Sequence, residues 1–498
     1  MSKYQLLIHG ELVNSSNGKM IDDISPATGG VIAQVPETTL DDMNRAVAAA
    51  REAFDDGRWS GLPHARRAAI LEKLASLVDE HAGELAALES QDTGKPIKLA
   101  RDSDLPFAAD NLHFFAGAAR HLAGTAAGEY SGGHTSIIRR EPVGVVASVA
   151  PWNYPFMMAA WKIGPALAAG NTVVFKPSPE TPLTALKLGE LALEAGIPAG
   201  VLNIIADGPE VAPSLASHKD VNMVSITGST RSGKYVMRAA ADAIRRVHLE
   251  LGGKAPFVVF DDANVEAAAN GAVAGGYVNC GQDCTAATRI YVQDRVYDSF
   301  MQSFLSKVQQ IRVGNPSDEH TDMGPLISGR QRDRVEGYVE RALHAGAQFL
   351  IGGKRARVAG LEHGFFFDPT VIAEDRQDAE IIQQEVFGPV VVVSRFQSEE
   401  EALAKANGVV YGLAASVWTN DVYKAMRVSK ALQFGTVWVN DHLPLTSEMP
   451  HGGYKESGIG KDMSIYSFEE YTQIKHVMIE LSGDARKGWH YTIFGDAE

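Results

Sequence analysis

Apolar residues recur along the chain at two different spacings, and the spacing changes near residue 143. Residues 4–36 are expected to form short strands, and from 41 to 123 apolar residues recur every three or four positions, which predicts a helix-rich region that includes one continuous helix at 65–88. Residues 143–149 form an almost unbroken apolar run, as expected of a strand buried on both faces of a sheet. From there to residue 250, strand-like and helix-like segments alternate. The alternation predicts an α/β fold with a doubly wound, Rossmann-like parallel sheet.

Two further regions complete the predicted architecture. After residue 252 strand-like and helix-like segments alternate again, which predicts a second α/β domain. Residues 124–142 are rich in glycine and threonine and lack an apolar core of their own, so we expect a projecting β-hairpin that contacts another subunit. Residues 464–481 are expected to form a helix and then a strand, whereas residues 487–498 match no pattern.

Composition narrows the function more than the fold. The 498 residues are 45% hydrophobic and 21% charged, which is typical of an ordered globular protein. A net charge of −15 disfavours binding to nucleic acid phosphates. Two cysteines cannot form a disulfide framework, and no apolar leader or membrane-spanning apolar run is found. We therefore expect a cytoplasmic protein without a membrane partner.

Polar residues follow three of the predicted strands closely, at positions 152–153, 176–178 and 228–230. The carboxyl ends of parallel strands meet at one edge, where the ligands of such sheets bind. The loop that begins with Gly228 and Ser229 precedes a helix, so its backbone N–H groups would bind a pyrophosphate. Loops of this form also occur as ordinary turns, and this loop alone does not decide between the two roles.

Both cysteines of the chain, Cys280 and Cys284, lie in one short segment, and Glu250 precedes the second by 34 positions. A thiol and a carboxylate together can divide an acyl transfer into two easier steps. The thiolate attacks a carbonyl, and the carboxylate later takes a proton from the water that releases the product. A structural core residue is the alternative, and it is the commoner role for an isolated cysteine.

Seven short motifs bear on this choice, and they span nearly the whole chain. They are PWNYP at 151–155, KPS at 176–178, TGST at 227–230, ELGGK at 250–254, GQDC at 281–284, EVFGP at 385–389 and GGYKESG at 452–458. In order and spacing they resemble the aldehyde dehydrogenase superfamily. Within it, the segments 147–161, 282–287 and 447–452 resemble most closely the γ-aminobutyraldehyde dehydrogenases of polyamine breakdown.

The resemblance implies a role for the residue at each of these positions. Cys284 would be the nucleophile, and Glu250 would activate the water that hydrolyses the thioester. Asn153 would donate a hydrogen bond to the oxyanion, and Lys162 would lie near the active site. No metal is implied. The cofactor-binding residues implied in the same way are Pro151, Trp152, Lys176, Ser178, Glu180, Gly228, Ser229, Gly233, Leu251, Glu385 and Phe387.

The implied reaction is NAD(P)-dependent oxidation of an aldehyde to the carboxylate through a cysteine thiohemiacetal and thioester. The narrower resemblance favours an ω-aminoaldehyde such as 4-aminobutanal, whose ammonium group needs acidic or aromatic partners. The alternatives are a broad-specificity, betaine-aldehyde or apolar or aromatic aldehyde dehydrogenase, and outside redox chemistry a cofactor-binding structural protein or a thiol hydrolase. The residues that we expect to contact the substrate are Asp104, Tyr154, Trp161, Asp283 and Glu448.

Three positions depart from the usual pattern of the superfamily. Cys280 stands four residues before the nucleophile, and His451 stands where Phe or Trp is usual. Pro179 stands where many NAD-preferring members carry glutamate, and Glu180 follows one position late. A carboxylate near the ribose repels a 2′-phosphate, so its displacement predicts that NAD is preferred and that NADP is used as well.

The resemblance also divides the chain into domains. Residues 1–123 and 143–252 would form the NAD(P)-binding domain, and residues 253–455 the catalytic domain. The hairpin 124–142 and the tail 465–498 would form an oligomerisation element. We therefore expect a homo-oligomer, either a dimer or a tetramer, with a small-molecule aldehyde as its substrate.

Overall fold

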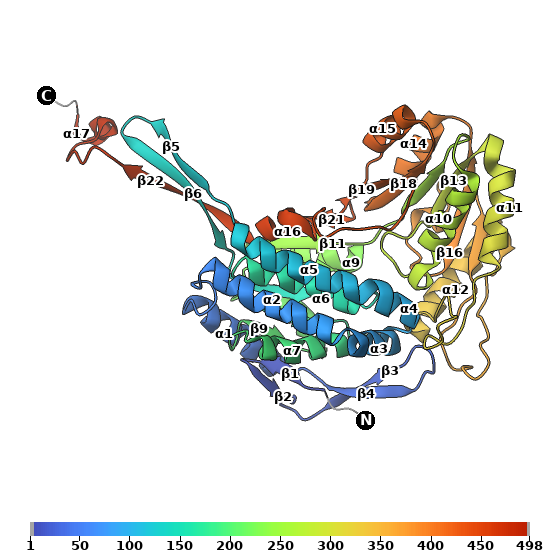
Figure 1. Ribbon diagram of the computed structural model, residues 1–498, viewed down its shortest axis with the longest axis horizontal. Coiled ribbons are helices and arrows are strands. Elements are labelled where there is room, and N and C mark those ends of the chain that lie inside the picture. The colour runs from blue at the N-terminus through green and yellow to red at the C-terminus, as the bar shows by residue number, and fades with distance from the viewer. Residues whose placement is uncertain (1–3, 496–498) are drawn as a thin grey trace.

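Two helix-covered sheets form the body of the molecule, and a three-stranded arm projects from it (Figure 1). The computed structural model describes residues 4–495. The strands of the first sheet are β1 (Leu6–Ile8), β2 (Glu11–Val13), β7 (Val145–Val149), β8 (Thr172–Lys176), β9 (Leu202–Ile204), β10 (Met223–Thr227), β11 (Arg246–Glu250) and β21 (Gly458–Ile459). They lie in the order β2-β1-β9-β8-β7-β10-β11-β21.

The five central strands of this sheet, β9 to β11, are parallel, and β1, β2 and β21 extend its edges antiparallel. Strand order reverses between β7 and β10, because β8 and β9 lie on the other side of β7. The register places Val149 opposite both Lys176 and Ile226, so these strands end at one level. This arrangement confirms the predicted fold class, and ligands of such sheets bind at the reversal.

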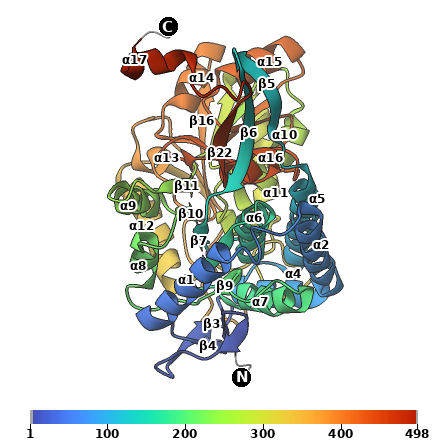
Figure 2. The same cartoon turned by 90° about the vertical axis from the view of Figure 1, so that its left-hand side faces the viewer.

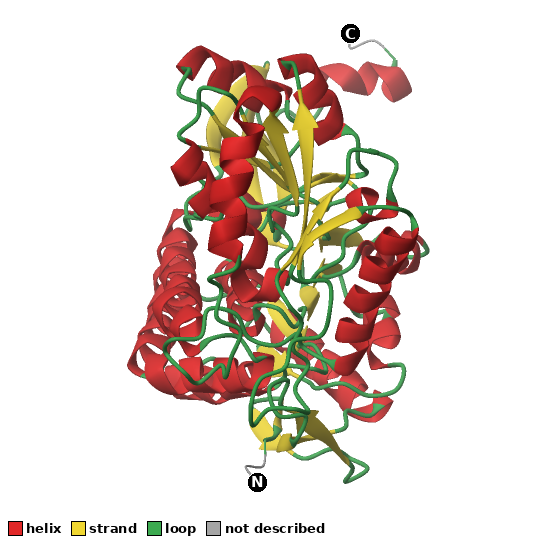
Figure 3. Cartoon of the chain, turned by 90° about the vertical axis from the view of Figure 1, so that its right-hand side faces the viewer, coloured by secondary structure: helices red, strands yellow, loops and turns green. Residues whose placement is uncertain are grey.

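Helices cover both faces of the first sheet (Figure 3). Val173 and Phe175 of β8 belong to a core shared with helices on one face, whereas Val174 belongs to a second core on the opposite face. Neighbouring side chains of a strand point to opposite faces, so all of β8 is buried. The first face carries α2 (His64–Glu80), α5 (Leu105–Ala118), α6 (Pro155–Ala168) and α7 (Leu183–Ala195), and the second carries α1 (Leu40–Asp55), α8 (Val211–Ser217) and α9 (Thr230–Ala241).

The continuous helix predicted at 65–88 is two helices, α2 and α3 (Ala82–Thr93), so that prediction was wrong. His81 separates them with φ −98° and ψ 9°, outside helical geometry. The apolar spacing continues across the break, because α3 buries Leu85 and Ala86 in the same core as α2. A short helix α4 (Ile97–Leu99) and a π-helix (Ala100–Asp104) then lead into α5.

The second sheet has seven strands, of which only the edge strand β14 is antiparallel. Their order is β14-β15-β16-β13-β12-β18-β19, with bounds β12 (Pro256–Val259), β13 (Arg289–Gln293), β14 (Gln348–Ile351), β15 (Thr370–Ala373), β16 (Val390–Phe396), β18 (Ala414–Trp418) and β19 (Thr436–Val439). Its helices are α10 (Val265–Tyr277), α11 (Tyr297–Val308), α12 (Gly329–His344), α13 (Glu380–Gln383), α14 (Glu399–Asn407) and α15 (Val422–Ala431).

The arm joins segments from opposite ends of the chain (Figures 1 and 2). The hairpin β5 (Thr125–Ser131) and β6 (His134–Pro142) pairs with β22 (Thr472–Glu480), which follows α16 (Ser464–Glu470). Pairing runs the whole length of β22, from Thr472 opposite Pro142 to Glu480 opposite His134. The short helix α17 (Tyr491–Phe494) lies beyond the tip. A small hairpin of β3 (Met20–Ile24) with β4 (Val31–Pro36) and an antiparallel pair of β17 (Tyr411–Gly412) with β20 (Tyr454–Lys455) are the remaining strands of the described residues.

Candidate active site

A cavity of about 1260 Å³ lies at the carboxyl edge of the first sheet and is closed by the second α/β unit. The first unit contributes the residues that directly follow β7, β10 and β11. The second contributes the segment that holds Cys284, together with Glu385 and Phe387. The polar stretches that were predicted to share one edge therefore meet the cysteine segment in one cavity.

The backbone ahead of Cys284 has an unusual conformation. Asn279 and Cys280 have φ angles of 49° and 59°, and Gly281 has 65°, all in the left-handed region. Glycine is required at 281, because a Cβ there would lie 2.2 Å from the carbonyl oxygen of Gly388. The Asn279 amide stabilises this turn by donating hydrogen bonds to the carbonyl oxygens of Asn153 (2.8 Å) and Gln282 (3.3 Å). The turn thereby fixes Cys284 relative to the loop after β7.

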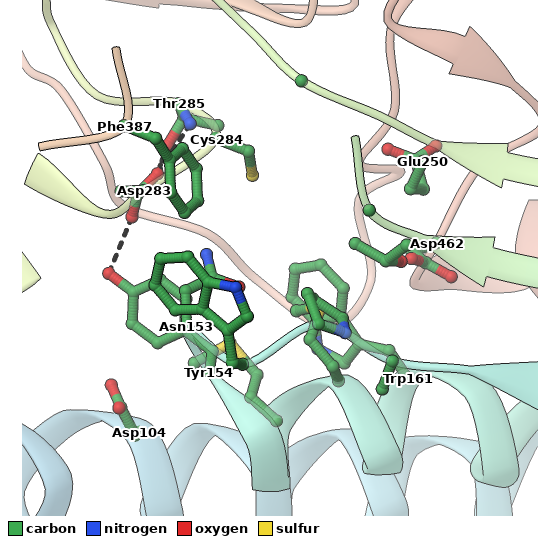
Figure 4. A pocket seen from close by; sticks show the side chains of 18 of the residues that line it. Asp104, Asn153, Tyr154, Trp161, Glu250, Asp283, Cys284, Thr285, Phe387 and Asp462 are labelled. Atoms are coloured by element: carbon green, nitrogen blue, oxygen red, sulfur yellow. Dashed lines mark hydrogen bonds between the residues drawn. The ribbon is translucent and has the colours of Figure 1, made fainter. Parts of the chain in front are cut away.

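The Cys284 thiol points toward the side of the cavity that carries Glu250 and Asp462 (Figure 4). Burial raises the pKa of this thiol well above its usual value, and the charges of Asp283, Glu385 and Glu250 raise it further. The thiol is therefore protonated at rest. Nδ2 of Asn153 donates one hydrogen bond to the Gln282 carbonyl oxygen (3.1 Å), which leaves its second N–H group for another acceptor.

Glu250 is the last residue of β11, and its Oε1 atom is buried without a hydrogen-bond partner among the described residues. Burial raises the pKa of the Glu250 carboxyl well above its usual value, and the neighbouring charge of Asp462 raises it further. Lys162 opposes this effect from a fully buried position, where its Nζ atom lies 2.9 Å from Asp462 Oδ2. A carboxyl group with a raised pKa keeps its proton to higher pH than an ordinary glutamate does.

Aromatic side chains form the wall of the cavity on the α5 and α6 side. Trp161 packs edge-on against Phe107, with ring centroids 6.3 Å apart, and its ring lies 5.3 Å from that of His451. Burial lowers the pKa of His451 to about 4, so this ring is neutral. Tyr154 donates a hydrogen bond to Asp283 Oδ2 (2.7 Å), and Oδ1 of the same carboxylate accepts one from the Thr285 backbone (2.6 Å), as Figure 4 shows.

The predicted cofactor residues divide into a layer at the cavity and a layer behind it. Ser229 caps the N-terminus of α9, which opens on the cavity, and Trp152 packs edge-on against Phe387. Glu385 accepts a hydrogen bond from the Gly253 backbone (2.8 Å), and burial raises its pKa to about 7. The cavity is lined by Pro151, Trp152, Glu180, Gly228, Ser229, Leu251, Glu385 and Phe387, whereas Lys176, Ser178 and Gly233 lie behind it.

Each residue of the rear layer supports one of the lining residues or pairs with another side chain. Ser178 donates a hydrogen bond to Glu180 Oε2 (2.6 Å), and the Lys176 ammonium pairs with Asp207 (2.7 Å). A Cβ at Gly233 would lie 2.5 Å from Cδ1 of Leu251, so only glycine lets the first turn of α9 approach that residue.

Comparison with known proteins agrees with this geometry. The sequence profile described as the aldehyde dehydrogenase family matches residues 12–477. The chain belongs to the aldehyde dehydrogenase family. It is 42% identical to a betaine aldehyde dehydrogenase of Bacillus subtilis (strain 168). The alignment spans 473 residues, which are 95% of this chain and 96% of that protein.

Solved structures show the same fold for this aldehyde dehydrogenase. A betaine aldehyde dehydrogenase of Staphylococcus aureus in complex with NAD+ is 41% identical, with a TM-score of 0.95 over 97% of this chain and 95% of that one. An NAD-dependent aldehyde dehydrogenase of Sinorhizobium meliloti is 40% identical, with a TM-score of 0.95 over 97% and 96%. The resemblance to the superfamily is confirmed. The narrower resemblance to γ-aminobutyraldehyde dehydrogenases is corrected, because the relatives named for a substrate are betaine aldehyde dehydrogenases.

Two of the acids predicted to contact the substrate do not suit that role in this aldehyde dehydrogenase. Glu448 is exposed and does not line the cavity. Asp104 lines it, but its carboxylate is 1% exposed and is already paired with the ammonium of Lys95, which lies 4.4 Å from the centre of the Tyr154 ring. The other three predicted residues, Tyr154, Trp161 and Asp283, do line the cavity.

Several residues at the site were not predicted. Asp462 and the pair of Lys95 with Asp104 are fully buried charges, and His248 lies 3.4 Å from Lys162 Nζ. Asp462 follows the glycine-rich segment 452–460 after one residue, Lys461, and charged residues at the end of such a segment were the available signal. No group of three or more acidic, His or Cys side chains suited to a metal occurs within residues 4–495, and no helix there could cross a membrane.

Proposed function

We propose that the chain oxidises an aldehyde to the carboxylate with NAD(P), through a thioester on Cys284. One observation carries the proposal: a thiol and a carboxyl group from two different α/β units face one cavity that also opens on the reversal point of the first sheet. A structural protein on this fold would not need Cys284 and Glu250 to face each other. A thiol hydrolase would not need the cofactor layer beside them.

The side chains at the reversal point fit a dinucleotide. The N-terminus of α9, where Ser229 caps only the Ser232 N–H, provides further backbone N–H groups for a pyrophosphate, and the buried hydroxyl of Thr230 has no partner among the described residues. Glu385 provides a carboxylate for ribose hydroxyls beside the aromatic pair of Trp152 and Phe387. When bound, NAD(P) supplies an acceptor for the hydride that leaves the substrate carbon.

The residues of the chain perform the remaining steps. Cys284 attacks the carbonyl carbon after its thiol has lost its proton to solvent in the cavity. The oxyanion then accepts the free N–H of Asn153, and one such donor contributes about 3–4 kcal/mol to lowering the barrier. After oxidation to the thioester, Glu250 takes a proton from water, and the attack of that water releases the carboxylate and the Cys284 thiolate.

A cationic aldehyde is the substrate that the cavity favours, and betaine aldehyde is the first candidate. The named relatives support it, and so do the aromatic faces of Tyr154 and Trp161 at the cavity. A trimethylammonium group has no N–H group and therefore needs no hydrogen-bond acceptor. Cation–π contacts with aromatic faces are sufficient to bind it. The carboxylates of Asp104 and Asp283 already have partners within the protein, so neither of these two acids is free for a primary ammonium.

The second candidate is 4-aminobutanal, and one observation favours it. Nδ1 of His451 is buried beside Trp161 and has no hydrogen-bond partner among residues 4–495. A neutral imidazole nitrogen of this kind can accept a hydrogen bond from a primary ammonium but receives none from a quaternary one.

Two matched substrate pairs test the proposal. 3,3-Dimethylbutanal is the uncharged isostere of betaine aldehyde, and pentanal is that of 4-aminobutanal. We expect kcat/KM for betaine aldehyde to exceed that for 3,3-dimethylbutanal about 30-fold, since a desolvated cation–π contact contributes about 2 kcal/mol. Trp161→Leu should reduce this ratio and leave the rate with 3,3-dimethylbutanal nearly unchanged.

The other outcomes are equally informative. Equal kcat/KM values for the charged and uncharged isosteres would mean that the substrate is an apolar aldehyde and not a cationic one. A charge preference confined to the second pair would promote 4-aminobutanal over betaine aldehyde. If no aldehyde yields NADH or NADPH, the proposed oxidation itself is wrong.

A further inference from the structure

An ion pair joins the two α/β units at the cofactor half of the cavity. Nη2 of Arg330, in the first turn of α12, lies 2.5 Å from Oε1 of Glu180, which follows β8. Both residues line the cavity. Oε2 of Glu180 already accepts a hydrogen bond from Ser178 (2.6 Å), so both oxygens of this carboxylate have partners.

The position of this pair identifies the part of the cofactor that it faces. Glu180 lies at the carboxyl end of β8, next to β7, where an acidic residue of a dinucleotide-binding sheet takes the adenosine ribose. A carboxylate there accepts a hydrogen bond from a 2′-hydroxyl and repels a 2′-phosphate. With Arg330 on Glu180, the local charge is neutral and the repulsion is reduced.

The Arg330 guanidinium is free to change partners. Its side chain is 85% exposed, and an ion pair of such a residue contributes little to stability. A phosphate accepts two parallel hydrogen bonds from a guanidinium, which is a stronger contact than a single exposed carboxylate contact. Arg231 also lines the cavity, but it lies at the start of α9, after β10 and two strands away from β8. Lys176 is 4% exposed and held by Asp207, and Arg334 donates to the Glu385 carbonyl oxygen (2.7 Å). These two cations are therefore not available to a 2′-phosphate.

We propose that Arg330 is a cofactor-specificity residue that gives this site its affinity for NADP. With NAD the guanidinium stays on Glu180, and with NADP it leaves Glu180 and binds the 2′-phosphate. The proposal rests on the proposed function, since it concerns the cofactor of the same site.

Equilibrium binding of NADP and NAD to the full chain, measured by titration calorimetry without aldehyde, tests the role directly. Arg330→Gln should raise the Kd of NADP about tenfold, the loss of one charge-assisted contact, and that of NAD less than twofold. The Kd of NADP for Arg330→Lys should lie between those of the wild type and Arg330→Gln, because lysine keeps the positive charge but cannot donate two parallel hydrogen bonds. Glu180→Gln should lower the Kd of NADP, since it removes the competing carboxylate.

The matched control is Arg341→Gln, on the same helix, where the guanidinium pairs with Glu380 (2.7 Å) and does not line the cavity. It should leave both dissociation constants unchanged. Equal weakening of both dinucleotides by Arg330→Gln, or no change for NADP, would overturn the proposal while leaving the oxidation intact. A wild-type chain that binds NAD and not NADP would overturn it too. A chain that binds neither dinucleotide would overturn the proposed function with it.

Discussion

In the proposed mechanism, the protonation states of Cys284 and Glu250 decide what each group can do. Glu250 is buried and Cys284 is partly buried, and desolvation raises the pKa of the thiol and of the carboxyl group. The resting site therefore avoids two adjacent negative charges in a region that water reaches poorly. A proton must move before Cys284 attacks, and another must move when water attacks the thioester.

The thiol and the acid should fail in different ways. Cys284→Ala should abolish aldehyde oxidation while NAD still binds, because the alanine offers no nucleophile. Glu250→Gln should release about one equivalent of NADH per site and then stall, since it cannot activate water for the thioester. Stopped-flow absorbance at the NADH band measures the first turnover. The absence of a fast phase in Glu250→Gln would mean that Glu250 is also indispensable for activating Cys284.

The neighbouring charges of Asp462 and Lys162 should set the pH dependence of kcat through the pKa of Glu250. Activity rises as the Glu250 carboxyl loses its proton, so its raised pKa shifts the rising limb above the range of an ordinary glutamate. Asp462 raises that pKa, so Asp462→Asn should move the limb to lower pH; Lys162 lowers it, so Lys162→Met should move the limb to higher pH.

The double variant Lys162→Met with Asp462→Asn is the control, because it removes both charges together. Its limb should lie between those of the single variants, and thermal unfolding checks that each variant is folded. Two single variants that shift the limb in the same direction would contradict the account.

From the sequence, residues within short motifs could be assigned to the site. Partners that meet only in the folded chain could not. Cys284, Glu250 and Asn153 each stand in a short motif, and the structure brings all three to one cavity. The partnership of Lys162 with Asp462 spans 300 positions, and no local pattern indicates which acid a buried lysine will meet. Asp104 was assigned to the substrate for the same reason. The sequence shows the acid but not its buried ion pair with Lys95.

At the level of elements, buried parallel strands were the most predictable part of the chain. All five residues of β8 are buried on a sheet with helices on both faces, and such strands show continuous apolar runs. The break at His81 was missed because the apolar spacing continues through it. Strands β14 and β15 were missed too, because each has only four residues and β14 is a partly buried edge strand.

Close contact between two elements should make Gly253 intolerant of a side chain. A Cβ at this position, just after β11, would lie 2.1 Å from the carbonyl oxygen of Cys284. Gly253→Ala must therefore displace the nucleophile, and a displacement of about 1 Å costs about 100-fold in rate. We expect kcat/KM to fall at least that much while circular dichroism shows an intact fold.

Gly117→Ala is the matched control for Gly253→Ala. Gly117 lies in α5, and a Cβ there meets no atom within 4 Å. An alanine in an exposed helical position should stabilise the protein by up to about 1 kcal/mol and leave activity unchanged. Full activity in Gly253→Ala would show that the Cys284 segment has room to move.

At the scale of the whole molecule, the three-stranded arm projects from the body, and no other part of the described chain packs over it. It carries exposed apolar side chains on β22 and beyond, including Ile474, Met478 and Leu481. β22 is also the edge strand of its sheet, with unpaired backbone groups along its outer side. A long exposed edge with apolar side chains is a surface for another chain. We propose that a second copy covers it and that the protein is a homo-oligomer.

Two charges on β22 should therefore separate the subunits. Ile474 and Met478 are 65% and 49% exposed and four positions apart, so they lie on one face of the strand. Aspartates at both positions would place charge where the interface excludes water. We expect Ile474→Asp with Met478→Asp to sediment as a smaller species than the wild-type protein. Leu343→Asp, a charge on the equally apolar and 58% exposed Leu343 of α12, should leave the mass unchanged. A wild-type protein that sediments as a monomer, or a double variant of unchanged mass, would show that the arm does not join subunits.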